Sequence, residues 1–156
     1  MGFYQYRREQ LIKQPMETVW DFISSPKNLK EITPDYMGFD ITSIGLPEKM
    51  YAGMIISYQV TPISGYKTTW VTEITHVEEG KYFVDEQRVG PYKMWHHEHI
   101  LQPRDNDTLM IDIISYQPPL GILGDIANKF VIRSKIAEIF DYREQVLDRL
   151  FNSNEK

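Results

Sequence analysis

Alternation of apolar and polar residues with a period of two dominates the middle of this chain. Successive side chains of a β-strand point to opposite faces, so such alternation predicts half-buried strands. Short turns separate the segments, among them Ser64–Gly65 and Gly90–Pro91. Strands of this length joined by short turns predict an antiparallel meander. The alternating segments are residues 39–43, 53–62, 66–77, 81–89, 92–102 and 108–117.

The residues before the meander predict a strand and two short helices. Residues 3–13 mix aromatic, charged and apolar side chains, and we interpret them as a first strand. Apolar residues recur at spacings of three and four over residues 16–23, which predicts an amphipathic helix. Leu29 and Ile32 indicate a second short helix, which has to end before Pro34 because the residue preceding a proline disfavours helical angles.

A helical period follows the meander, from about residue 124 to residue 151. We expect its apolar stripe to include Leu123, Ile126, Phe130 and Phe140, with charged residues such as Arg143 on other faces. A helix of about 27 residues is ~40 Å long, which fits only if it lies across a curved sheet. A straight helix does not fill a concave sheet, so we expect a cavity for a small apolar ligand between them.

The composition is that of an ordinary globular domain, with 156 residues, 42% of them hydrophobic and 25% charged. Because no linker, repeat or low-complexity segment interrupts it, residues 1–156 are expected to form a single domain. The 17 Lys and Arg against 22 Asp and Glu leave a net charge of −5. This balance argues against nucleic acid as a partner, because phosphate binding needs clustered cations. The chain has no cysteine, which excludes disulfides and thiolate catalysis.

The sequence also bears on membranes and location. No stretch approaches the roughly 18–20 apolar residues that span a bilayer, so integral membrane association is not expected. The first residues lack the apolar core of a signal peptide, and we expect a cytoplasmic protein. An oligomeric state is not indicated by any of these patterns.

Polar side chains interrupt strand faces that are otherwise apolar. If the three strands are neighbours, these side chains meet at the floor of the cavity. A buried carboxylate has to be paired or hydrogen-bonded, and a histidine between two aspartates tends to stay protonated. Three interpretations remain open: a hydrogen-bond network that fixes strand register, a polar site that binds a ligand, and a general base. The three pairs are Asp85 with Gln87, His97 with His99, and Asp112 with Tyr116.

His97-x-His99 with Asp112 also has the composition of a two-histidine-one-carboxylate metal site. The cupin family uses a His-x-His strand too, with a Glu four or five residues after the second histidine. Here those positions are Pro103 and Arg104, and a second cupin motif is missing. We therefore expect no metal and no cofactor.

Aromatic side chains complete the candidate ligand-binding set. Strand aromatics and Phe130 of the helix would supply apolar walls, although aromatics in such positions also serve as plain core. No Gly-x-Ser-x-Gly elbow, paired-Glu pattern or phosphate-binding loop is present, so no catalytic residue is assigned. The candidate ligand-binding residues are Tyr58, Trp70, Asp85, Gln87, Trp95, His97, His99, Asp112, Tyr116 and Phe130.

The order of elements and several motifs resemble the helix-grip superfamily, which includes START lipid-transfer domains, the birch-pollen-allergen type, and polyketide cyclases and dehydratases. The resemblance is nearest to a bacterial branch of ligand-binding SRPBCC-domain proteins. It implies an α+β helix-grip fold, with a bent antiparallel sheet of about seven strands around a long C-terminal helix and two short helices after the first strand. The carrying motifs are Trp70-x-x-x-Ile74, Phe83-x-Asp85-x-Gln87-x-x-Gly90-Pro91, Trp95-x-His97-x-His99 and Asp112-x-x-x-Tyr116-x-x-Pro119-x-Gly121.

The expected function is binding of a small hydrophobic or amphipathic molecule, such as a lipid, between the sheet and the C-terminal helix. One alternative is an enzyme of the cyclase or dehydratase type that uses His97 or Asp112 for proton transfer. A second alternative is a non-catalytic partner module for an epimerase-like protein. The resemblance implies the cavity but no particular substrate, and we expect a binding protein rather than an enzyme.

Overall fold

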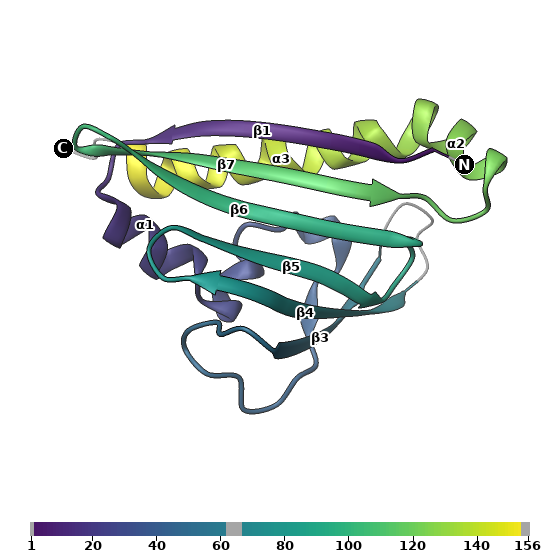
Figure 1. The fold of residues 1–156 in the computed structure, drawn as a ribbon, viewed down its shortest axis with the longest axis horizontal. Coiled ribbons are helices and arrows are strands. Elements are labelled where there is room, and N and C mark those ends of the chain that lie inside the picture. The colour runs from purple at the N-terminus through teal and green to yellow at the C-terminus, as the bar shows by residue number, and fades with distance from the viewer. Residues whose placement is uncertain (1, 62–66, 154–156) are drawn as a thin grey trace.

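One antiparallel sheet curves around a C-terminal helix in the computed structural model, which describes residues 2–61 and 67–153 (Figure 1). Its seven strands within these residues lie in the order β1-β7-β6-β5-β4-β3-β2. The predicted meander is confirmed, while the turn expected at Ser64–Gly65 lies outside the described residues. The strands are β1 (Tyr4–Ile12), β2 (Asp40–Ile41), β3 (Met54–Val60), β4 (Thr68–Glu78), β5 (Tyr82–Val89), β6 (Met94–Arg104) and β7 (Asp107–Gln117).

The pairing register brings the polar side chains of three strands to one face. His97 of β6 lies opposite Asp85 of β5, and His99 lies opposite Asp112 of β7. Directly opposed residues share a face of the sheet. Between β4 and β5 the register shifts twice, and such bulges increase local bending. The bent sheet therefore presents these side chains on its concave side.

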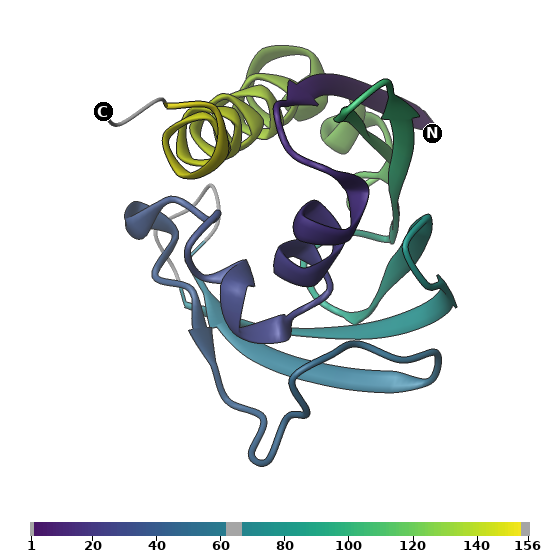
Figure 2. The same ribbon diagram turned by 90° about the vertical axis from the view of Figure 1, so that its left-hand side faces the viewer.

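Three short helical segments connect β1 to β2. Helix α1 (Met16–Ile23) starts after Pro15 and buries Val19, Trp20 and Ile23, as its spacing predicts. Two 3-10 turns follow, η1 (Pro26–Leu29) and η2 (Asp35–Met37). In Figure 2, α1 lies between the C-terminal helix and strands β3 and β4. These segments therefore cover the end of the space that the curved sheet encloses.

The C-terminal helix is continuous from Ile122 to Asn152 and runs along β1 and β7 (Figure 1). It consists of α2 (Ile122–Ala127), the wider π-helical segment η3 (Asn128–Ile132), α3 (Arg133–Leu147) and the π-helical segment η4 (Asp148–Asn152). Arg8 of β1 donates to Asp141 and Glu144, which fastens the outer side of α3 to the sheet edge. No helix in the two described ranges has the length and apolar character needed to cross a membrane.

The first third of this helix buries a different face from the one predicted. Leu123, Ile126 and Phe130 are exposed, Phe130 by 70%. The prediction assumed 3.6 residues per turn throughout, but the π-helical segment η3 takes more residues per turn and changes the phase. The buried positions follow one another in steps of four, namely Gly124, Asn128, Ile132, Ile136 and Phe140. At Gly124 a Cβ would lie 1.9 Å from the Pro119 carbonyl oxygen, so only glycine fits there.

Two phenylalanines of the C-terminal helix test this assignment. Phe140 is 4% exposed and lies against the rings of Tyr6 and His97, whereas Phe130 is largely exposed. We expect Phe140→Ala to lower the free energy of unfolding by about 3–5 kcal/mol, and Phe130→Ala by about 0.5 kcal/mol or less. Urea unfolding followed by circular dichroism measures both. Equal losses would contradict the observed burial.

Candidate functional site

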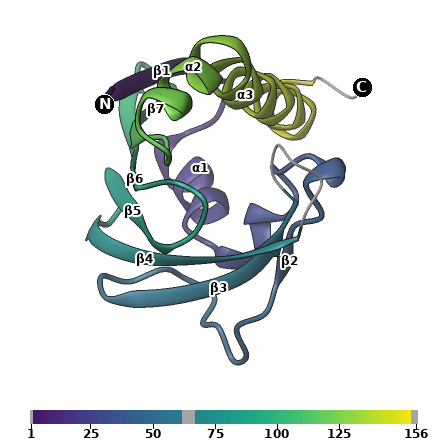
Figure 3. The same cartoon turned by 90° about the vertical axis from the view of Figure 1, so that its right-hand side faces the viewer.

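A cavity of about 360 Å³ lies between the concave face of the sheet, the turns η1 and η2, and helix α3. In Figure 3 the C-terminal helix lies above strands β3 and β4, and both the helix and these strands contribute residues to the cavity wall. Its walls are mainly apolar. They include Met50, Ile56, Phe83, Tyr92, Ile136 and Ile139, contributed by the sheet, the loops and the helix.

Six of the ten sequence-predicted residues line this cavity, and four do not. Gln87, Asp112, Tyr116 and Phe130 are not among its lining residues. Phe130 faces outward for the reason given above, so its prediction as a wall residue is wrong. The six that line the cavity are Tyr58, Trp70, Asp85, Trp95, His97 and His99.

Gln87 and Tyr116 have structural partners instead. The Gln87 side-chain amide donates to the Tyr92 carbonyl at 2.6 Å and accepts from the Tyr92 backbone N–H at 3.1 Å, which braces the turn between β5 and β6. The buried Tyr116 hydroxyl donates to Asn128 Oδ1 at 2.7 Å and ties β7 to the C-terminal helix. For these two residues the structure corrects the expected position, because local hydrogen bonds turn their polar atoms away from the cavity.

Aromatic side chains form one wall of the cavity. Tyr58 stacks on Trp70 at 6.3 Å between ring centroids, and Trp95 meets Trp70 edge-on at 5.4 Å. The Trp70 ring N–H donates to Thr72 Oγ1 at 3.1 Å, and the Tyr58 hydroxyl contacts the same oxygen. Burial raises the pKa of Tyr58, which stays neutral. With the polar atoms of Tyr58 and Trp70 bonded to Thr72 within the sheet, these two residues present apolar ring faces to the cavity.

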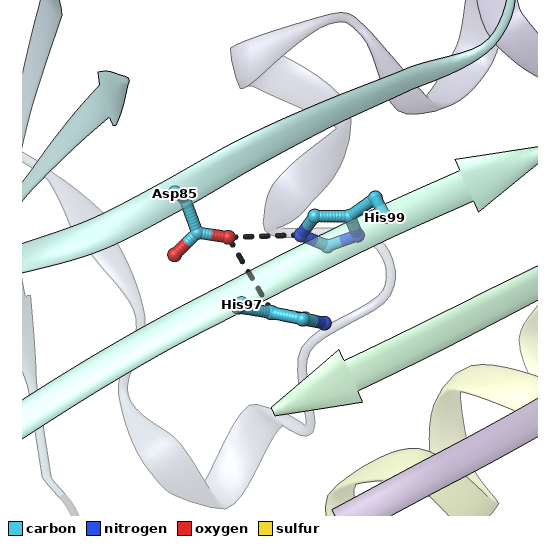
Figure 4. A group of neighbouring side chains, drawn as sticks. All are labelled: Asp85, His97 and His99. Atoms are coloured by element: carbon cyan, nitrogen blue, oxygen red, sulfur yellow. Dashed lines mark hydrogen bonds and ion pairs between the residues drawn. The ribbon is translucent and has the colours of Figure 1, made fainter. Parts of the chain in front are cut away.

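A closed cluster of two histidines and two aspartates lies at the polar end of the cavity, and Figure 4 shows three of its members, Asp85, His97 and His99. Asp112 Oδ1 is 2.9 Å from His97 Nε2 and 3.0 Å from His99 Nδ1. Asp85 Oδ2 is 2.8 Å from His99 Nε2 and 3.4 Å from His97 Nδ1. The expected pairing of the aspartates with the histidines is therefore present. Asp85 borders the cavity, while Asp112 lies on the far side of the two rings.

Arg143 of α3 belongs to this cluster, although the helical pattern of the sequence predicted an outer face for it. It is buried, lines the cavity, and places Nη1 at 3.3 Å from Asp112 Oδ1. Its Nε is buried with no hydrogen-bond partner among the described residues. Because charged residues are ordinarily exposed, the buried position of Arg143 was not predicted. Arg143 lies three residues after Phe140 and four residues before Leu147, and both of these residues are buried. This helical spacing places Arg143 on the inner stripe, and it is the signal in the sequence that indicates its position.

The electrostatics of the cluster follow from burial and these contacts. Burial, followed by the neighbouring His99, lowers the pKa of His97 to about 4, so this imidazole is neutral at neutral pH. Burial also opposes protonation of His99, but its hydrogen bonds with Asp112 and Asp85 outweigh it and raise the pKa. Burial acts to raise the pKa of both aspartates, yet the histidine hydrogen bonds hold each below its ordinary value. The two carboxylates thus face His99, whose pKa is raised, and the Arg143 guanidinium.

Comparison with known proteins identifies the family of this chain. A model described as Domain of unknown function (DUF8410) matches residues 10–151. The chain belongs to this family. No curated protein matches the sequence of this DUF8410 member at a significant level.

Solved structures share the fold of this DUF8410 member at low sequence identity. TTHA0849 from Thermus thermophilus has a TM-score of 0.66 and 16% identity, covering 94% of this chain and 99% of that chain. Major latex-like protein 151 from Panax ginseng has a TM-score of 0.66 and 11% identity, covering 97% and 99%. A norcoclaurine synthase point mutant from Thalictrum flavum, in complex with a transition state analogue, has a TM-score of 0.66 and 12% identity, covering 96% of each. The helix-grip fold expected from the sequence is confirmed.

The substitution Asp112→Asn tests the charge pairing. It keeps the shape of the side chain and removes its charge, so burial should dominate at His99 and lower the pKa of that imidazole. The titration of the histidine ring signals by NMR measures this change. The control Glu86→Gln removes a carboxylate on the other face of β6, where Glu86 contacts His96 at 2.8 Å, and should leave the His99 titration unchanged. Unchanged His99 titration in Asp112→Asn would mean that the pairing does not govern its charge.

Proposed function

We propose that this protein binds a small hydrophobic or amphipathic molecule in the cavity between the sheet and the C-terminal helix. The observation that carries this proposal is the polarity of the cavity. Its walls are apolar and aromatic, while His97, His99, Asp85 and Arg143 gather at one end. An apolar body would lie against Trp70 and Trp95, with a polar head group at the cluster.

The size of the cavity supports this proposal. About 360 Å³ falls within the range of roughly 300–1,000 Å³ that is typical of small-molecule sites. A protein of the same fold, norcoclaurine synthase, was solved in complex with a transition state analogue, so this architecture can hold a small molecule. We include in the proposal the narrower assignment to the ligand-binding SRPBCC branch and the organisation of residues 1–156 as one domain.

The polar end of the cavity suggests the character of the head group. Arg143 lines this end of the cavity, so its guanidinium would donate to a ligand oxygen there. A carboxylate or carbonyl oxygen suits a guanidinium donor, because charge-assisted hydrogen bonds are stronger than neutral ones. An acceptor-bearing amphipathic molecule is therefore the ligand class that we propose. For the cyclase or dehydratase alternative, Asp112 is poorly placed, since it does not line the cavity.

An anionic fluorescent probe with an apolar ring system, such as anilinonaphthalene sulfonate, tests ligand binding. We expect saturable binding at one site per chain, with higher emission as the probe enters the cavity. Trp95→Ala should weaken probe binding because Trp95 forms part of the aromatic wall. Phe130→Ala is the matched control, because it removes an exposed aromatic ring outside the cavity.

A second variant separates loss of the cavity from loss of stability. Ile139 of α3 lines the cavity and is only partly buried, so Ile139→Trp should fill the space while keeping apolar area. We expect this variant to keep its thermal transition and to lose probe binding. Probe affinity that is unchanged in both Trp95→Ala and Ile139→Trp would contradict binding in this cavity.

A further inference from the structure

We propose that Asp85, His97 and His99 form a binding site for a first-row divalent metal cation at the polar end of the cavity. Each residue offers one ligand atom, and these three atoms lie within 4.8 Å of one another. Figure 4 shows the Asp85 carboxylate facing both imidazole rings. Two imidazole nitrogens with one carboxylate oxygen are a ligand set that binds zinc, cobalt and iron. This inference goes beyond the proposed ligand binding and does not depend on it.

The separations between the ligand atoms suit a bound cation. Asp85 Oδ2 lies 2.8 Å from His99 Nε2 and 3.4 Å from His97 Nδ1. Zinc takes nitrogen and carboxylate oxygen ligands at roughly 2.0–2.2 Å, which sets neighbouring ligand atoms about 2.8–3.6 Å apart for angles between 90° and 109°. The two observed separations lie within this range.

The opposite nitrogen of each ring is already oriented by one carboxylate. His97 Nε2 and His99 Nδ1 lie 2.9 Å and 3.0 Å from the same oxygen, Asp112 Oδ1. Metal-binding histidines almost always donate their second N–H to a carboxylate, carbonyl or water, which fixes the tautomer and the ring orientation. Arg143 in turn contacts Asp112. Asp112 is thus a positioning residue that directs His97 Nδ1 and His99 Nε2 toward Asp85.

This arrangement differs from the one considered in the sequence. There Asp112 was the third candidate ligand, and the lack of a cupin-like glutamate argued against a metal. In the structure Asp85 takes that place on β5, and Asp112 lies on the other side of the rings. The three proposed ligands line the cavity, so the remaining coordination positions face it. A carboxylate, carbonyl or hydroxyl oxygen of a molecule in the cavity would then complete the coordination.

The outer face of the same strands supplies a matched control. His96 of β6 contacts Glu86 of β5 at 2.8 Å, so it reproduces a histidine–carboxylate pair without the second histidine and Asp112. It is part-exposed, as expected of an ordinary surface pair. Removing this pair leaves the proposed site intact.

The test uses the full chain, freed of metals by a chelator and titrated with zinc alone by calorimetry and with cobalt alone by visible absorption. We expect one equivalent of either cation per chain. Asp85→Asn and His99→Ala should each weaken zinc binding by at least about 10-fold, and Asp112→Asn by about 10- to 100-fold. The double control His96→Ala with Glu86→Gln should bind as the wild type does. Near-ultraviolet circular dichroism confirms that each variant is folded.

NMR of the histidine rings gives a second readout that misfolding cannot imitate. Zinc should shift the ring signals of His97 and His99 and leave those of His76 and His96 unchanged. The proposal is overturned if neither cation binds saturably, or if binding is lost in the His96–Glu86 control. Metal binding without probe binding would support the metal site and contradict the proposed ligand binding. Probe binding without metal binding would support the proposed ligand binding and contradict the metal site.

Discussion

A straight helix does not fill the concave face of a strongly bent sheet, and most of this structure follows from that mismatch. The seven strands turn around the C-terminal helix, and the bulges between β4 and β5 sharpen the bend. Contacts between β1 and α3 hold the helix at one edge, so the far part of the sheet stands away from it. The resulting cavity is a property of the architecture, and the side chains decide only how it is lined.

Burial of charge is the second constraint, and it explains why the cluster is so highly connected. An isolated carboxylate in an apolar interior is too costly, so each aspartate contacts both histidines. Arg143 supplies a positive charge from the helix. The cluster therefore links three strands to α3 and also gives the cavity a charged, polar end. The residues that form this structural network are therefore also the ones that we propose to bind a ligand.

Alternation along the strands was sufficient to predict which residues share a face. The side-chain period of a strand is fixed, so Asp85, His97, His99 and Asp112 had to lie on the concave side once the register was set. The aromatic wall followed from the same rule, through Tyr58, Trp70 and Trp95. Much of the candidate site was therefore accessible from the sequence, together with the helix-grip fold.

The sequence determined the order of the elements, the faces of the strands and the polar residues among the apolar ones, because these depend on local periodicity. Only the tertiary structure decided the inner face of the C-terminal helix, where the π-helical segment η3 moves Phe130 outward, while packing against the sheet brings Arg143 inward. It also decided that Asp85 and not Asp112 borders the cavity. These outcomes depend on the phase of the helix and on how it packs against the sheet. Residues far apart in the sequence determine this packing together, so no local pattern predicts it.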